Sequence, residues 1–303
     1  MDWPDLKPNQ KRVVIIGAGF AGLALAKKLP PARFQVILLD KNNYHQFQPL
    51  LYQLVTGGLD PGSISFPLRK IFRKQENVYI RVAEVLSVHE PSKTIATSIG
   101  EISYDYLVLA QGSVTNYFNN RQLQENAYSM KSVSEALLLR NTLLQNYEKA
   151  IIAEDEGTRE ALLNVVIVGG GPTGVELAGA IAEMKAHILP KDYTEVNFCK
   201  MHIFLIEAAS GLLNGMDKKN GVTVKEYLAK LGVEVRTDTI LKEFDGAGVL
   251  LSDGSVIGSK CVIWTAGVIG AEIKGLPLES LQPNKRIRVD VFNEVIGMKD
   301  VFA

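Results

Sequence analysis

The sequence predicts an α/β fold with two parallel-sheet units and a small antiparallel β-layer. An apolar stretch at residues 13–29 runs from a β-branched strand through a glycine turn into a helix, and the same pattern returns at residues 163–179. The 303 residues, with 47% hydrophobic content, are enough for about two domains. Strand, glycine turn and helix in this order are typical of Rossmann-like dinucleotide-binding units.

The first glycine turn follows residues 13–16, an apolar run suited to the centre of a parallel sheet. Gly17, Gly19 and Gly22 occupy the three glycine positions of GxGxxG. The first permits the tight turn, the second lets a pyrophosphate approach the backbone, and the third lets helix and strand pack closely. The helix N-terminus then favours the anion. A single motif of this kind has an alternative explanation, since a glycine turn between strand and helix can serve packing alone.

An acid completes this first pattern. The second strand, residues 35–40, ends in Asp40, close to the offset of roughly 20 residues at which a carboxylate accepts from ribose hydroxyls. The stretch therefore predicts a nucleotide site. The connection at residues 41–58 is rich in aromatics and amides, and is either a binding loop or a packed loop with a helix beginning near Pro49. His45 is expected to be structural.

Short alternating strands are expected after this connection. They should form the antiparallel layer before the chain returns to the parallel sheet, and they cover residues 78–82, 85–89, 94–97 and 104–110. Residues 132–153 predict a helix capped by Ser132 or Ser134, with apolar residues at helical spacing.

The second glycine turn follows the apolar strand 165–168, with Gly169, Gly171 and Gly174 again at the motif positions. Two copies of one unit are stronger evidence for nucleotide binding than either copy alone. Glu207 ends the next strand, further along than usual because residues 186–193 lengthen the connection. The alternative is that Glu207 is a solvated acid at the end of its strand and has no part in binding.

The residues after Glu207 bear on nucleotide choice. Ala208 and Ala209 follow with no nearby arginine, so a carboxylate here favours NADH and repels the 2′-phosphate of NADPH. The unit is completed by strands near residues 233–236, 248–251 and 261–264, with a hairpin turn at Asp253–Gly254.

Composition excludes several classes. The 33 basic and 33 acidic residues balance, and no long basic run indicates a nucleic-acid partner. Cys199 and Cys261 cannot form a disulfide framework or a zinc quartet, so a reducing compartment and no metal are expected. No apolar run reaches the length of a membrane span, and the N-terminus lacks the features of a signal peptide.

The chain resembles the type II (non-proton-pumping) NADH:quinone oxidoreductases, a branch of the two-dinucleotide-binding flavoproteins of the pyridine nucleotide-disulfide oxidoreductase superfamily. The superfamily likeness rests on both glycine motifs and on residues 104–113 and 264–267; the narrower likeness rests on residues 43–53, 112–118 and 174–179. Gln111 departs from the pattern, since many members have threonine or another small residue there.

This resemblance implies an FAD-dependent, non-electrogenic NADH dehydrogenase of a respiratory chain. FAD is expected along residues 17–22 with Asp40 on its ribose, and NADH along residues 169–174 with Glu207 on its ribose. Hydride passes from NADH to FAD, and electrons then pass to a quinone. No cysteine pair follows Asp40, which argues against disulfide and sulfide reductases. A ferredoxin or rubredoxin reductase-like flavoprotein and a nucleotide-binding redox sensor are the alternatives.

The expected cofactor-binding residues come from both turns and from the stretches that the resemblance covers. They are Gly17, Gly19, Phe20, Ala21, Gly22, Asp40, Lys41, Pro49, Leu50, Leu51, Val85, Ala110, Gln111, Gly112, Gly169, Gly171, Pro172, Thr173, Gly174, Glu207, Ala266 and Gly267. Glu176, expected in the first turn of its helix, is the catalytic candidate. It would position the nicotinamide or move a proton. The alternative is that Glu176 is only an acid favoured near the N-terminus of its helix.

The expected domains are an FAD-binding part at residues 1–125, an NADH-binding domain with a connecting helix at 126–267, and an incomplete return to the FAD domain at 268–303. The family would continue into an Ile-Gly-Asp motif that contacts the flavin, so the chain is expected to be C-terminally truncated. It is expected to hold FAD weakly or not at all and to have little quinone reductase activity. The expected location is peripheral, on the cytoplasmic side of the cell membrane, through a C-terminal part absent here; this segment alone would be soluble. A homodimer is compatible with the sequence.

Overall fold

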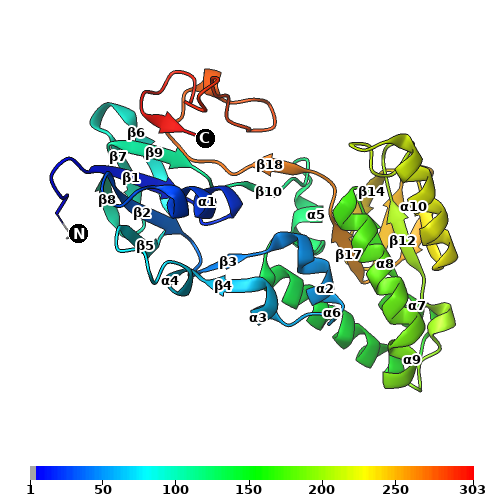
Figure 1. Cartoon of the computed structure of the whole chain (residues 1–303). Coiled ribbons are helices and arrows are strands. Elements are labelled where there is room, and N and C mark those ends of the chain that lie inside the picture. The colour runs from blue at the N-terminus through cyan, green and yellow to red at the C-terminus, as the bar shows by residue number, and fades with distance from the viewer. Residues whose placement is uncertain (1–4) are drawn as a thin grey trace. The chain divides into compact units, whose positions relative to one another are not determined.

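The computed structural model describes residues 5–303, which form two compact units (Figure 1). Unit 1 comprises the described residues up to Gln46, together with Ser65–Val114 and Val268–Ala303; unit 2 comprises Phe47–Ile64 and Thr115–Gly267. The domain boundaries expected from the sequence stay a prediction. The N-terminal residues 1–4, on which the expectation of no signal peptide depends, lie outside the described part.

Unit 1 is built on a parallel sheet with the strand order β19-β9-β1-β2-β5. The central strand β1 (Lys11–Ile16) pairs with β2 (Phe34–Asp40) and β9 (Tyr106–Leu109). The edge strands are β5 (Val78–Val82) and β19 (Val301–Phe302). Helix α1 (Phe20–Lys28) follows β1 directly.

Both faces of this sheet are covered, which explains its unbroken apolar strands. Because side chains alternate along a strand, Val13 and Ile15 pack in one core with Ala26 of α1, whereas Val14 and Ile16 pack in another. The second core includes Val88, from the three-stranded antiparallel layer of β6 (Val85–His89), β7 (Thr94–Thr97) and β8 (Gly100–Ser103).

The expected antiparallel layer is present, but its membership differs from the prediction. Residues 78–82 form β5, which pairs in parallel with β2, Val78 opposite Val36. Burial of Ile80 against the α1 face of the large sheet accounts for this placement. Strand β8 was not predicted; it completes the small layer in its place. The strand predicted at 104–110 is β9, which also pairs in parallel, with the central strand β1.

Unit 2 repeats the design with the parallel order β13-β12-β11-β17. Its strands are β11 (Val165–Val168), β12 (Ile203–Ile206), β13 (Val233–Arg236) and β17 (Cys261–Trp264), and its long helices include α8 (Pro172–His187) and α10 (Lys218–Lys230). The antiparallel β14 (Leu241–Phe244), β15 (Gly248–Leu251) and β16 (Val256–Gly258) lie in a separate sheet. The hairpin predicted at Asp253–Gly254 is confirmed, and Gly254 has a φ of +85°.

Helix α6 (Val133–Ile152) confirms the predicted long helix. Its N-cap is Ser132, whose hydroxyl oxygen accepts from the amide of Glu135, as a capping box requires. The remaining short elements are β3 (Tyr44–Gln46), η1 (Gln48–Leu50), α2 (Leu51–Val55), α3 (Pro61–Ile64), β4 (Ser65–Pro67), α4 (Leu68–Ile71), η2 (Glu90–Ser92), β10 (Ser113–Thr115), α5 (Arg121–Asn126), α7 (Glu156–Leu163), α9 (Leu189–Asp192), η3 (Phe198–Lys200), β18 (Val268–Gly270) and η4 (Leu278–Ser280). Among residues 5–303, no helix combines the length and apolar character needed to cross a membrane.

Candidate functional site

The three glycines of the first turn differ in what surrounds them. Gly17 has a φ of +100°, and a Cβ there would lie 2.3 Å from the carbonyl oxygen of Ala110. A Cβ on Gly22 would lie 1.9 Å from the carbonyl oxygen of Gly17. A Cβ on Gly19 would have no atom within 4 Å. The outer glycines are therefore required by packing, and the middle one faces the space that a phosphate could enter.

Ala18, the residue between the first two glycines, is held at both of its backbone polar groups. Its amide donates to Asp40 Oδ2 at 2.7 Å, while Asp40 Oδ1 accepts from the amide of Asn42 at 2.8 Å. Its carbonyl oxygen lies 2.9 Å from Nδ1 of the buried His45. Because a carbonyl oxygen only accepts, Nδ1 carries the hydrogen here. Burial and this hydrogen bond fit the expected structural role of His45, and its ring also meets the edge of Phe20.

The chain after β9 also reaches this turn. Ala110 donates its amide to the carbonyl of Ile16, and Gly112 adopts a φ of +72°. The Gln111 side chain donates through Nε2 to the carbonyl of Ala271 at 3.3 Å. Its Oε1 atom is buried and has no hydrogen-bond partner among residues 5–303. An acceptor in this state fits a donor that a bound group would supply.

The other residues expected around the first cofactor belong to several different elements. Lys41 forms an exposed ion pair with Glu84 at 2.7 Å, and Val85 is half-buried at the start of β6. Ala21 is exposed on α1. The remaining three residues, which belong to unit 2, are Pro49, Leu50 and Leu51. Of these, Leu51 is a core residue of α2. Their role stays a prediction.

The second turn reproduces the first. Gly169 has a φ of +114°, and a Cβ there would lie 2.8 Å from the amide nitrogen of Ala266. A Cβ on Gly174 would lie 1.9 Å from the carbonyl oxygen of Gly169, and one on Gly171 would meet nothing within 4 Å. Ala266 therefore packs against the turn through its backbone.

Gly170 is likewise held at both backbone polar groups. Its amide donates to Glu207 Oε2, while Glu207 Oε1 accepts from the amide of Ala209 at 2.8 Å. Its carbonyl oxygen accepts from the amide of Leu213 at 2.9 Å. Leu213 is buried and adopts a left-handed backbone with a φ of +54°. The segment 208–217, here called the acid loop, is therefore fastened to the glycine turn.

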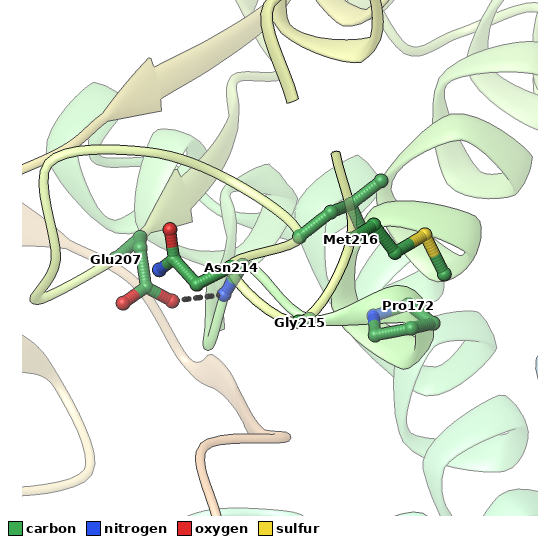
Figure 2. Close-up of a pocket in the computed structure, with 8 residues that line it drawn as sticks. Pro172, Glu207, Asn214, Gly215 and Met216 are labelled. Atoms are coloured by element: carbon green, nitrogen blue, oxygen red, sulfur yellow. Dashed lines mark hydrogen bonds between the residues drawn. The ribbon is translucent and has the colours of Figure 1, made fainter. Parts of the chain in front are cut away.

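The acid loop and the second turn enclose a pocket of about 360 Å³ (Figure 2). Its lining residues are Gly170, Gly171, Pro172, Glu207, Leu213, Asn214, Gly215 and Met216. Glu207 and the turn residues were predicted. Asn214 and Met216 were missed, although Asn214–Gly215 is a turn dipeptide that marks a loop at this place.

Two further predicted residues flank the second turn. Thr173 is exposed in the first turn of α8, beside the N-cap Gly171. Gly267 has a φ of +84°, and a Cβ there would lie 3.1 Å from the ring of Phe118. Neither makes a contact that identifies a ligand.

The placement of Glu176 corrects one expectation. Helix α8 begins at Pro172, so Glu176 is its fifth residue, and the first turn contains no acid. Stabilisation by the helix N-terminus therefore does not account for this glutamate. Glu176 is exposed, and within residues 5–303 its side chain has no hydrogen-bond or ion-pair partner. Partial desolvation by its surroundings nevertheless raises the pKa of its carboxyl.

The cysteines do not form a pair at either turn. Both are free: Cys199 is exposed, and Cys261 is buried in β17. Burial raises the pKa of the Cys261 thiol to about 12, which makes it unreactive near neutral pH. Among the described residues, no group of three or more His, Cys, Asp or Glu side chains could hold a metal ion.

Comparison with known proteins gives consistent results. The sequence model of the pyridine nucleotide-disulphide oxidoreductase family matches residues 11–303. The type II NADH:quinone oxidoreductase Ndh of Mycobacterium tuberculosis is 36% identical, over 97% of this chain and 64% of that protein. The external alternative NAD(P)H-ubiquinone oxidoreductase B2 of Arabidopsis thaliana mitochondria is 29% identical, over 97% of this chain and 54% of that protein.

The solved structure of Plasmodium falciparum NDH2 in complex with NADH matches with a TM-score of 0.90 and 25% identity, over 97% of this chain and 63% of that chain. The sulfide:quinone oxidoreductase of Aquifex aeolicus, at 21% identity, TM-score 0.75 and coverage of 96% of this chain and 67% of that one, shares the fold. The predicted α/β fold class is confirmed. The chain spans between 54% and 64% of the length of the two curated relatives.

Proposed function

The chain belongs to the pyridine nucleotide-disulphide oxidoreductase family, and on this premise we propose that it carries the two dinucleotide-binding units of an FAD-dependent NADH:quinone oxidoreductase. The observation that carries the proposal is the duplicated turn. In each copy an acid holds the amide of the residue after the first glycine, and the next glycine faces open space. The names of the Mycobacterium tuberculosis and Plasmodium falciparum relatives support the choice of substrates.

We assign FAD to the first turn and NADH to the second. The N-termini of α1 and α8 favour the pyrophosphates, and Asp40 and Glu207 accept from the ribose hydroxyls. The unpartnered Gln111 Oε1 fits a donor of the bound flavin nucleotide. When bound, FAD supplies the group that accepts a hydride and delivers electrons onward. The chain's own contribution is to bind and orient both nucleotides.

The second site is proposed to prefer NADH to NADPH. Glu207 faces the pocket, and the acid loop that lines its other side contains no lysine or arginine. A 2′-phosphate would therefore meet a carboxylate and find no cation in this loop to pair with. The likeness to a protein solved with NADH supports this choice.

Glu176 is proposed as the catalytic acid or base. In the part of the chain that the structure describes, its side chain forms no hydrogen bond or ion pair, and desolvation raises the pKa of its carboxyl, which brings the exchange of a proton closer to neutral pH. In this role its carboxylate holds and releases a proton during the reaction, or positions the nicotinamide. Attachment to the cytoplasmic side of a membrane and a homodimer stay predictions of the family resemblance.

The test is a steady-state assay of the purified protein with FAD, NADH and a soluble quinone. We expect the quinone to accept the electrons of NADH with no thiol or carrier protein added, at a low rate because this chain is expected to hold FAD weakly. A requirement for ferredoxin or rubredoxin as the acceptor would replace the proposal with a carrier-protein reductase. A reduced flavin that persists in the presence of the quinone would replace it with a redox sensor.

A further inference from the structure

The pocket beside the second turn has a polar end and an apolar end. Figure 2 shows the side chains of Glu207 and Asn214 side by side at one end, with Met216 and Pro172 at the other. Both polar side chains lie on the chain that follows β12, and both line the pocket. A polar group of a ligand would therefore be placed between Glu207 and Asn214.

The acid loop holds Asn214 in this place from both sides. The preceding residue, Leu213, is buried, and its amide is bonded to the carbonyl of Gly170 at 2.9 Å. After Asn214, the amide of Met216 donates to the carbonyl of Leu213 at 2.8 Å, and Asp217 caps α10 by accepting from Lys219. The backbone path is thus set by the fold and does not depend on the asparagine side chain.

The side chain of Asn214 has unused hydrogen-bonding capacity. It is exposed, and among residues 5–303 its carboxamide forms no hydrogen bond. Glu207, by contrast, already accepts one backbone N–H on each carboxylate oxygen. Each of these oxygens retains a lone pair for a further donor, but a carboxylate has nothing to donate.

A hydroxyl group needs both kinds of partner, because its oxygen donates one hydrogen and accepts others. Resting on the proposed function, we infer that Asn214 is a second recognition residue for the adenosine ribose of NADH. The Asn214 amide nitrogen donates to the oxygen of the same ribose hydroxyl whose hydrogen Glu207 accepts. Glu207 alone would satisfy the hydroxyl's hydrogen and leave its lone pairs without a protein partner.

Direct binding measurements test this inference without the quinone reaction. Titration calorimetry would compare NADH with two analogues that lack either the 2′- or the 3′-hydroxyl of the adenosine ribose. We expect Asn214→Ala to weaken the binding of NADH about three- to tenfold, the effect of one lost hydrogen bond. With the analogue that lacks the contacted hydroxyl, the wild type and the variant should bind equally, because the coupling is then absent.

Two more variants sharpen the result. Asn214→Asp keeps the size of the side chain but removes the donor and adds a second carboxylate, so it should lose at least as much affinity as Asn214→Ala. Asn220→Ala, at an exposed asparagine of α10 outside the pocket, is the matched control and should bind NADH as the wild type does. Thermal melting should be unchanged in Asn214→Ala and Asn220→Ala, because neither asparagine side chain forms a hydrogen bond among residues 5–303.

The outcomes separate this inference from the proposed function. If the wild type binds NADH and Asn214→Ala binds it equally well, the inference is wrong and the proposed function stands. If Asn214→Ala weakens NADH and both deoxy analogues by the same factor, Asn214 contacts the base or the phosphates, and the ribose assignment is wrong. If the wild type binds no NADH, both are wrong.

Discussion

The two glycine turns hold the same backbone groups through different contacts. In both, an acid at the end of the second strand accepts from the amide of the residue after the first glycine, Ala18 or Gly170. The carbonyl of that residue is bonded by the His45 ring in unit 1 and by the Leu213 amide in unit 2. The first turn therefore depends on a side chain, and the second depends on the path of the backbone.

The segments that follow the two acids therefore reach their turns through different groups. A ring nitrogen reaches the carbonyl of Ala18 from β3 without bringing a loop backbone to that group. The amide of Leu213 reaches the carbonyl of Gly170 only because the acid loop passes over the turn, and that passage creates the pocket. The same backbone group is thus supported by a side chain in unit 1 and by the backbone of a loop in unit 2.

The largest expected effect tests what the turns share. Gly22→Ala and Gly174→Ala each place a Cβ 1.9 Å from a backbone oxygen, which the turn cannot avoid without moving a strand or helix. Each variant should lose at least about 3 kcal/mol of unfolding free energy in urea titrations. A large loss in one variant and none in the other would show that the two turns are not packed alike.

The matched controls are Gly19→Ala and Gly171→Ala, whose new methyl groups meet no protein atom. Their stability should stay close to that of the wild type, because nothing has to move. Dinucleotide binding should weaken, because the methyl group occupies the approach expected for the pyrophosphate. Flavin retention measures the first variant, and calorimetric titration with NADH measures the second.

The next prediction tests the difference between the turns. His45→Phe keeps an aromatic ring beside Phe20 but leaves the buried carbonyl of Ala18 without its partner. The unfolding free energy should fall by about 1–3 kcal/mol, measured in urea. His187→Phe, at an exposed histidine at the end of α8, is the control. No loss for His45→Phe would mean that the ring does not support the first turn.

A smaller effect is expected from the two acids, and it should differ between the units. Glu207→Gln should narrow the preference for NADH over NADPH by about tenfold in catalytic efficiency, since a 2′-phosphate no longer meets a carboxylate. Asp40→Asn should leave that ratio unchanged and weaken flavin retention. A change in the ratio for Asp40→Asn, or none for Glu207→Gln, would contradict the assignment of the two nucleotides.

The smallest effect concerns a residue that the first helix lacks, since Ala24 of α1 corresponds to Glu176 of α8. Desolvation raises the pKa of the Glu176 carboxyl above its usual 4.5. The folded state therefore holds this proton more tightly than the unfolded chain does. Its contribution to stability is therefore greatest below the unfolded pKa and is lost as pH rises through the folded pKa.

Glu176→Gln should remove this loss of stability with rising pH. The melting temperature of the variant should therefore depend less on pH than that of the wild type. Glu183→Gln, on the same helix, is the control for charge removal alone. If Glu176 is catalytic, the variant should also show several-fold lower turnover or a changed pH profile. Turnover that matches the wild type at every pH would end the catalytic assignment.

The fold could be predicted because its main signals are local. Short β-branched runs followed by GxGxxG fix strand, turn and helix within about ten residues, and the steric need for Gly22 and Gly174 follows from the motif itself. The acids Asp40 and Glu207 could be found because each ends a strand. Their bonds to the amides of Ala18 and Gly170 could not, because spacing along the chain does not show them.

The errors arose where neighbours in space decide the outcome. Residues 78–82 alternate in a way that suits either sheet, and only the packing of Ile80 selects the parallel one. The bond from Leu213 to Gly170 involves a backbone amide, so no residue type marks it. Glu176 was predicted in the first turn of its helix. Because α8 begins at Pro172, Glu176 lies beyond that turn.

The division of the chain between the units also sets the order in which their described residues are synthesised. Every residue of unit 2 has been synthesised once Gly267 is added. The sheet of unit 1 still lacks its edge strand β19, which pairs with β9 through Val301 and Phe302. The first glycine turn is therefore synthesised early in translation, but its sheet gains this edge strand only after the last assigned residue of unit 2, Gly267, has been added.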